Sequence, residues 1–132
     1  MSDVARRGED FAAFWTERHL CTLSTVRRSG TPHVTPVGAT LDVGSGIARV
    51  ICSRTSQKVR NVRAAGADGA PVTLCQVDGR RWSALEGRAV VREDAESVAD
   101  AEWRYAQRYR VPRENPRRVV IEVRVTRVLG TV

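Results

Sequence analysis

Alternation of apolar and polar residues near the end of the chain is the feature that most constrains the fold. Val119, Ile121, Val123 and Val125 alternate with polar side chains over most of residues 118–128. Successive side chains of a strand point to opposite faces of a sheet, so this period predicts a strand with one buried face. The rest of the chain therefore has to supply the neighbouring strands of a sheet that packs on one side.

Further strands are predicted where β-branched and apolar residues gather between turn residues. The two clearest turns are Val43-Gly44-Ser45-Gly46, which joins the third strand to its predecessor, and Asp78-Gly79, a dipeptide that favours tight hairpins. Hairpin links of this kind predict antiparallel neighbours. The predicted strands cover residues 20–27, 32–42, 47–53, 71–78 and 81–91.

The second of these strands carries two breakers, Pro36 and Gly38. Proline cannot donate to a ladder of hydrogen bonds, and glycine inside a strand often marks a bulge or a close approach of another group. Residues 32–42 are therefore predicted to lie at an edge of the sheet or beside a bound group.

Three helices complete the predicted structure. Residues 8–18 carry Phe11, Phe14 and Trp15 at helical spacing, residues 55–65 form a short helix, and residues 94–109 form a longer one that begins at Asp94. About six antiparallel strands with three helices predict a mainly β fold, a closed or partly closed barrel with Greek-key character. No linker or repeat divides the chain, so we expect one domain over residues 1–132.

Composition narrows the class of protein. Of the 132 residues 42% are hydrophobic, and no apolar run reaches the length of a membrane span. The first residues lack the apolar core of a signal peptide. We therefore expect a soluble, cytoplasmic protein.

The three cysteines, Cys21, Cys52 and Cys75, lie far apart in strand-like segments and lack the spacing of metal ligands. Free cysteine in such segments behaves as a small hydrophobic residue. The sequence predicts free thiols and no metal site.

A net charge of +7 raises the question of an anionic partner. The basic residues are dispersed, and no basic helical stripe, zinc motif or aromatic RNA-binding signature accompanies them. These observations do not favour nucleic acid. A non-enzymatic module that binds nucleic acid or an anionic ligand such as haem stays open as an alternative.

The basic residues are most informative within residues 43–67, which contain no acidic residue. Lys58, the chain's single lysine, falls in the first turn of the predicted helix, which begins at Thr55 or Ser56. A cation there opposes the helix dipole by several tenths of a kcal/mol, roughly. Free N–H groups, a hydroxyl and an ammonium at one helix start predict an anion site. The alternative is a solvated basic helix.

The spacing Ser56-x-Lys58-x-x-Asn61 resembles the phosphate-binding helix of the split β-barrel flavoproteins related to pyridoxamine-phosphate oxidase. More narrowly, the chain is similar to their deazaflavin branch, the F420-dependent reductases of actinobacteria, and within it to the small biliverdin reductases. The similarity is co-linear over nearly the whole chain. It includes Glu17-Arg18-His19-Leu20, Pro32-His33-Val34, Gln76-Val77-Asp78-Gly79, Trp82, Leu85-Glu86-Gly87-Arg88, Arg104–Arg110 and Asn115–Val123.

The resemblance implies a homodimer with two cofactor sites at the subunit interface. Coenzyme F420 is the implied cofactor, with FMN as the alternative in the same fold. Arg54, Arg60 and Arg63 would face the acidic tail of F420. The residues implied to bind the cofactor are Thr55, Ser56, Lys58 and Asn61 around the phosphate, His33, Thr35, Pro36 and Val37 along the ring, and Gln76 from the segment 71–78.

The implied reaction is hydride transfer from reduced F420 to a planar conjugated acceptor such as biliverdin. An FMN-dependent oxidase or reductase of the same fold is the first alternative. The residues themselves identify no catalytic acid, base or nucleophile. The arginines implied to hold the substrate's propionates are Arg88, Arg110, Arg117 and Arg118.

Overall fold

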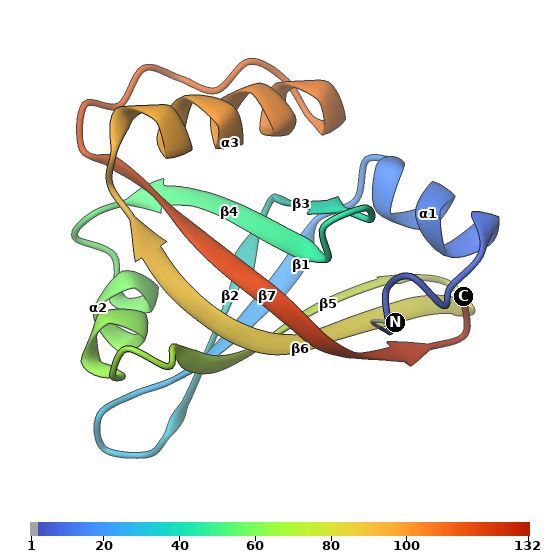
Figure 1. The fold of residues 1–132 in the computed structure, drawn as a ribbon, viewed down its shortest axis with the longest axis horizontal. Helices are drawn as coiled ribbons and strands as arrows, with labels where there is room; N and C mark the ends of the chain where they lie inside the picture. Colours follow the sequence, from blue (N-terminus) through green and yellow to red (C-terminus); the bar gives the residue numbers. More distant parts are fainter. Residues whose placement is uncertain (1–2) are drawn as a thin grey trace.

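The computed structural model describes residues 3–132, which curl seven antiparallel strands into one sheet flanked by three helices (Figure 1). The strand order across the sheet is β2-β1-β5-β6-β7-β4-β3. The strands are β1 (Cys21–Val26), β2 (Pro32–Val37), β3 (Ala39–Asp42), β4 (Ile47–Ser53), β5 (Ala70–Asp78), β6 (Arg81–Arg92) and β7 (Arg118–Gly130). The helices are α1 (Glu9–Thr16), α2 (Gln57–Ala64) and α3 (Ala95–Arg108).

The partly closed barrel predicted from the sequence is confirmed. Strands β2 and β3 follow one another in the chain, separated by Gly38 alone, yet they form the two opposite edges of the sheet. A single residue can join the two edges only if the sheet curls until they approach each other. The two predicted hairpin turns are also confirmed, because β3 pairs with β4 and β5 pairs with β6.

The breakers in residues 32–42 have the predicted effect, because the chain divides at Gly38 into β2 and β3 and both strands lie at edges of the sheet. The structure gives this glycine a packing reason. A Cβ at position 38 would lie 2.7 Å from a ring carbon of Tyr105 and 3.2 Å from one of Tyr109. The rings of Tyr105 in α3 and of Tyr109, the residue that caps its end, therefore occupy the space that a side chain would need.

We expect Gly38→Ala to lower the free energy of unfolding by about 1–3 kcal/mol, because the added methyl group would displace tightly packed rings. Urea denaturation of the purified protein measures this change. Gly66→Ala is the matched control, since a Cβ at position 66 would meet nothing within 4 Å. Equal losses in the two variants would contradict the packing explanation.

The core lies on the inner face of the curled sheet. Four fully buried residues mark it, one from each of the consecutive strands β1, β5, β6 and β7. They are Leu23, Leu74, Leu85 and Ile121. Each occupies the apolar phase of its strand, as the alternation in the sequence predicts. Val59 and Val62 of α2 and Phe11 and Trp15 of α1 join the same core.

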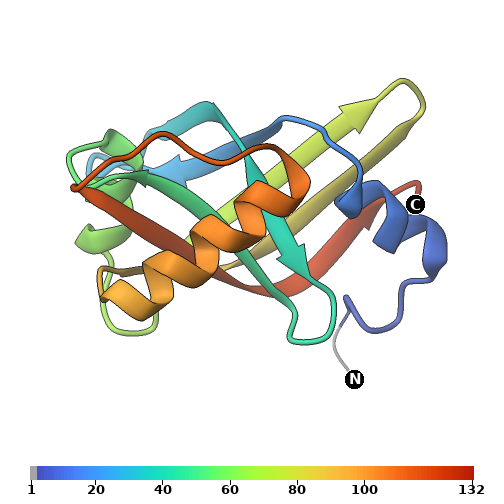
Figure 2. The same cartoon turned by 90° about the horizontal axis from the view of Figure 1, so that it is seen from above.

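Each helix covers a different part of the sheet. Helix α2 packs against β1, β5 and β6, and α1 packs against β3. Helix α3 lies across β3, β4 and β7, as the view from above shows (Figure 2). None of the helices formed by residues 3–132 has the length and apolar character that a membrane span requires.

Candidate anion-binding site

The first turn of α2 has no side-chain cap. Ser56 occupies the N-cap position, but its Oγ donates a hydrogen bond to the Ser53 carbonyl at 2.9 Å and does not accept from the helix N–H groups. The preceding residue, Thr55, is exposed, and its carbonyl accepts from Arg60 at 2.6 Å. The N–H groups at the start of α2 are therefore not capped by a side chain, which is the arrangement that binds anions.

Lys58 adds a full positive charge to the same turn. Its side chain is half-buried and has no carboxylate at ion-pair distance in the described chain. Burial raises the pKa of the nearby Cys52 thiol, and the charge of Lys58 opposes this rise most strongly, which places that charge beside the end of β4. An unneutralised ammonium at the positive end of a helix favours an anionic ligand.

Asn61 is used within the chain. Its side chain is buried, its Oδ1 accepts from Gln57 Nε2 at 2.7 Å, and its Nδ2 donates to Thr25 Oγ1 at 2.9 Å. These bonds tie α2 to β1. Asn61 therefore holds the helix in place beside the residues that were predicted to line the ring.

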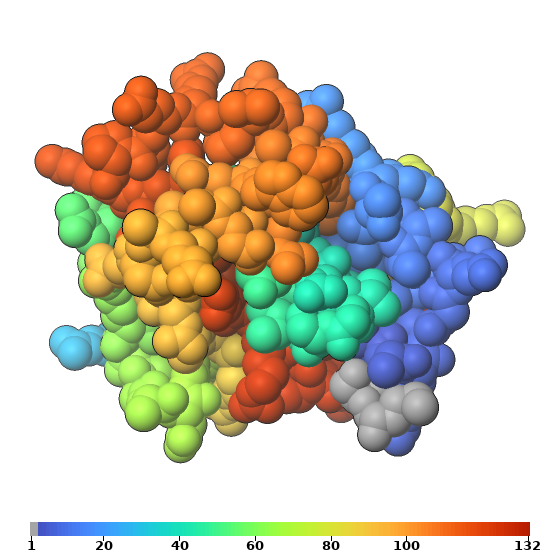
Figure 3. All heavy atoms as spheres, turned by 45° about the horizontal axis from the view of Figure 1, so that its top comes forward, coloured from blue at the N-terminus to red at the C-terminus, as the bar shows by residue number. Residues whose placement is uncertain are grey.

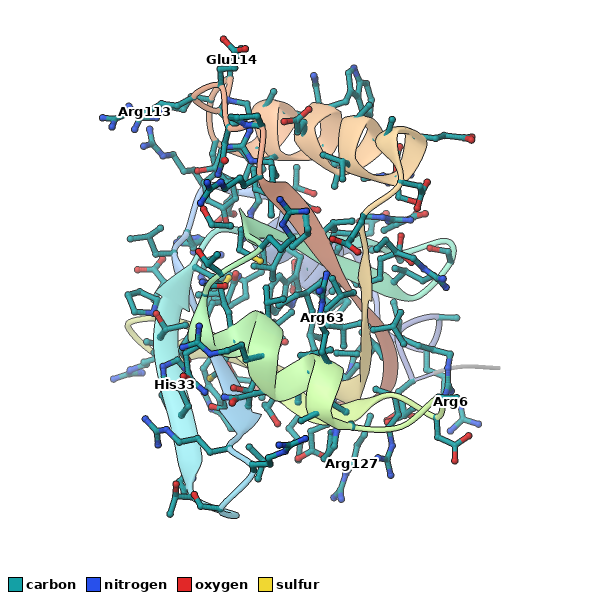
Figure 4. All side chains as sticks on the ribbon, turned by 90° about the vertical axis from the view of Figure 1, so that its left-hand side faces the viewer. Arg6, His33, Arg63, Arg113, Glu114 and Arg127 are labelled. Carbon is teal, nitrogen blue, oxygen red and sulfur yellow. The ribbon has the colours of Figure 1, made fainter. Side chains whose placement is uncertain are left out.

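Strand β2 presents its predicted ring residues on two faces. His33 is the register partner of Thr25 across the β1–β2 ladder, so the two side chains point to the same face. This is the face on which Thr25 contacts Asn61 of α2. Figure 4 shows His33 on β2, on the side where α2 packs. Thr35 and Val37 share this face, whereas Pro36 points to the outer face, where it is exposed. Alternation along the strand places Pro36 on the face opposite to His33, Thr35 and Val37, and its place along the ring stays a prediction.

One atom on this face lacks a partner. His33 Nδ1 is buried and forms no hydrogen bond in the described chain. Buried polar atoms of native proteins nearly always have a partner, so an orphaned one is a sign of a missing ligand, water or subunit.

A cleft of about 430 Å³ opens beside α2. Three guanidinium groups line it, from Arg28 in the β1–β2 turn and from Arg60 and Arg63 in α2, together with the amides of Gln57 and Asn61. No carboxylate of the described residues lines it, although Arg63 pairs with Glu93 at 2.9 Å outside the lining. Of the three arginines predicted to face an acidic tail, Arg60 and Arg63 line this cleft, and Arg54 does not.

Gln76 lies apart from these residues. Its amide is buried, with Nε2 donating to the Phe14 carbonyl at 2.8 Å and Oε1 accepting from Arg108 at 2.7 Å. It contacts Cys21 at the first residue of β1, whereas Asn61 reaches Thr25 near the last. Within one chain Gln76 therefore connects β5 with α1 and the end of α3, and its approach to the cofactor stays a prediction.

Sequence reasoning missed Arg108, which is buried and has no carboxylate partner in the part of the chain that the structure describes. Its guanidinium donates to the carbonyls of Glu17 at 2.8 Å and Ala39 at 2.6 Å, and to Gln76 at 2.7 Å. The hydroxyl of Tyr109 accepts from the Ala39 N–H at 3.1 Å, and burial raises its pKa. Arg108 follows Ala101 by seven residues, on the face that α3 buries, and this spacing could have identified it.

The four predicted substrate arginines do not form one group. Arg118 pairs with Glu102 at 2.7 Å and is largely buried. Arg110 and Arg117 are exposed in the loop after α3, and the carbonyl of Arg117 accepts from the Arg54 N–H close to α2. Arg88 lies on the outer face of β6, away from that loop.

Comparison with known proteins places this geometry in a family. Residues 8–131 match the family described as pyridoxamine 5'-phosphate oxidase. The chain is also 52% identical over 131 residues to the F420H(2)-dependent biliverdin reductase of Mycobacterium tuberculosis, covering 99% of this chain and 93% of that protein.

Solved structures share the fold at much lower identity. An F420 reductase superposes with a TM-score of 0.73 at 23% identity, covering 93% of this chain and 98% of the other. A conserved hypothetical protein of Mycobacterium tuberculosis superposes with a TM-score of 0.78 at 22% identity, covering 98% and 87%. At these identities the similarity shows a common fold alone.

Proposed function

The chain belongs to the pyridoxamine 5'-phosphate oxidase family, and on that premise we propose that it is an oxidoreductase that uses reduced coenzyme F420 to reduce a planar conjugated acceptor, biliverdin. The observation that carries the proposal is the 52% identity to an F420H(2)-dependent biliverdin reductase along nearly the whole of both chains. F420 is accordingly the cofactor, and the protein is an enzyme.

The residues beside α2 fit such a cofactor. Among residues 3–132, Lys58 has no anionic partner, the start of α2 has no side-chain cap, and His33 Nδ1 is buried without a hydrogen bond. The cleft lined by Arg28, Arg60 and Arg63 adds room and charge for an acidic tail. A cofactor with a phosphate, a flat ring and carboxylates would satisfy all of these groups.

In this proposal the side chains bind and orient, and the cofactor, when bound, supplies the hydride. Lys58 neutralises the phosphate, and Ser56 Oγ turns from the Ser53 carbonyl to donate to it. His33 and Thr35 would line the ring, to which the unpartnered His33 Nδ1 could bond, whereas Val37 is 8% exposed and belongs to the core behind them. Holding donor and acceptor together and excluding water is the main catalytic task that this geometry can perform.

The exposed arginines of the loop after α3 are our candidates for the substrate's propionates. Arg110 and Arg117 have no carboxylate partner in the described chain and lie on the segment whose backbone contacts Arg54. Arg118 is already paired with Glu102, so it is removed from the set. A guanidinium suits a carboxylate because it can donate two parallel hydrogen bonds.

An anaerobic assay with reduced F420 and biliverdin tests the function. We expect the visible absorbance of biliverdin to disappear while oxidised F420 accumulates in equal amount, because each turnover transfers one hydride. The control omits the protein. If the protein binds F420 but the biliverdin spectrum does not change, biliverdin is not the substrate, while the assignment of F420 as cofactor stands.

We further propose that two copies of the chain associate through the outer face of β2, β1 and β5. Val34 and Val77 are 58% and 67% exposed there, beside Val26, Pro36 and Trp82. The helices pack against other parts of the sheet or on its inner side, so this apolar surface stays open in the single chain. A second copy would cover these side chains, and large exposed apolar residues gathered on one face are typical of an interface.

Val77→Asp should convert a dimer into a monomer, because the substitution places an unpaired charge within the proposed interface. Size-exclusion chromatography with light scattering gives the mass directly. Val111→Asp is the control, because Val111 is 80% exposed but lies in the loop after α3. A monomeric wild type, or a variant that stays dimeric, would contradict this interface.

A further inference from the structure

A second and larger cleft lies on the outer side of the sheet. It has a volume of about 690 Å³, with β6 and β7 as its floor, Ile47 at the start of β4 on one wall and Ala67 and Asp68 of the loop after α2 on the other. Figure 3 shows atoms of β6 and β7 between that loop and the turn from β3 to β4. Its place on this outer side separates the cleft from α2, whose valines join the core on the inner side.

Two arginines stand directly opposite each other on the floor. Arg88 of β6 and Arg124 of β7 are register partners, so their side chains leave the same face side by side. Like charges in this arrangement destabilise a sheet. Neither guanidinium has an ion pair or hydrogen bond to another of residues 3–132.

The acidic groups of the cleft do not neutralise this pair. Glu122 is engaged by Arg92 at 3.3 Å and by Arg49 at 3.8 Å. Asp68 lines the opposite wall and forms no ion pair with Arg88 or Arg124. Arg88 and Arg124 therefore stay unpaired on the floor of the cleft, and the carboxylate of Asp68 lies on the wall across from them.

The remaining walls are apolar. Val90 follows Arg88 on the outer face of β6, and Ile47 is the register partner of Arg124 on β4. We infer that this cleft binds an organic anion, with its anionic head group between Arg88 and Arg124 and its apolar body along Ile47 and Val90. Two guanidinium groups around one carboxylate or phosphate replace the repulsion by charge-assisted hydrogen bonds.

This inference stands independently of the proposed reaction, because the cleft and the α2 site lie on opposite sides of β6. Ala89, between Arg88 and Val90, is fully buried in the core that Val59 and Val62 of α2 share. Alternation along the strand sends the flanking residues to the other face.

Calorimetric titration with 1-naphthoate, 1-naphthyl phosphate and neutral 1-naphthylmethanol tests the inference. We expect one or both anions to bind to the wild type and the alcohol not to bind, and the preferred anion identifies the head group. Arg88→Gln and Arg124→Gln should each weaken that binding by roughly tenfold or more, the size of one lost hydrogen bond to a charged group.

Arg127→Gln is the matched control, since Arg127 lies on β7 three residues from Arg124 and extends into solvent (Figure 4). Without a ligand, either glutamine variant of the pair should melt a degree or two higher, roughly, because the repulsion is removed. The inference is overturned if neither anion binds, if the alcohol binds equally well, or if Arg127→Gln weakens binding as much as the variants of the pair.

Discussion

Replacing Lys58 by alanine is expected to weaken F420 binding by roughly 10- to 100-fold, the range for a lost hydrogen bond between charged groups. Lys58 is half-buried in the first turn of α2 and has no carboxylate partner among residues 3–132. Its loss leaves the helix start with its N–H groups and the Ser56 hydroxyl, which together hold a phosphate less tightly. The side chain contributes no ion pair to the fold, so stability should change little.

Fluorescence titration of the purified variant with F420 measures this effect. Arg80→Ala serves as the control, because Arg80 is exposed and its side chain has no partner in the described chain. Lys58→Arg tests the shape of the cation, and we expect it to restore part of the affinity. Unchanged F420 affinity in Lys58→Ala would mean that the cofactor phosphate lies elsewhere.

Arg108→Met is expected to cost about 3–5 kcal/mol of unfolding free energy, the largest loss in stability that the structure predicts. The substitution removes the guanidinium donor of the Glu17 carbonyl and of Gln76 Oε1, and it leaves the Ala39 carbonyl with the Tyr109 hydroxyl alone at 3.0 Å. Each abandoned acceptor costs about 1–3 kcal/mol, and repacking recovers only a part of the sum. The residue holds α1, the start of β3 and α3 together.

Urea denaturation quantifies the loss, with Arg110→Met as a control two residues away on the exposed loop. The control should change stability by less than about 0.5 kcal/mol. A variant at position 108 that is as stable as the control would show that the buried hydrogen bonds contribute little net free energy.

The sheet could be predicted because its information is local. Alternation in residues 118–128 and the two hairpin turns were sufficient for β7 and for the pairs β3–β4 and β5–β6. The break at Gly38 could not be assigned its cause, because that cause lies in Tyr105 and Tyr109, about 70 residues further along the chain. Contacts at such separations leave no periodic trace in the sequence.

In the candidate site, as in the sheet, the local features could be predicted and the contacts between distant elements could not. Ser56 and Lys58 stood out because helix capping and helix charge are local properties, and the structure places both at the start of α2. Asn61 and Gln76 are both amides, and the sequence does not distinguish their roles. Burial and hydrogen bonds to other elements decide which groups each amide binds. Arg28 could not be predicted as part of the site, because only the packing of the β1–β2 turn brings it beside Arg60 and Arg63.

The measurement that tests the account most directly is a fluorescence titration of the wild-type protein with F420, run beside an identical titration with FMN. Both cofactors carry a phosphate and a tricyclic ring, so only F420 brings the acidic tail that the arginine-lined cleft beside α2 would bind. The account predicts saturable F420 binding and much weaker FMN binding. Tight FMN binding with weak F420 binding would contradict it, while keeping the fold and the phosphate site.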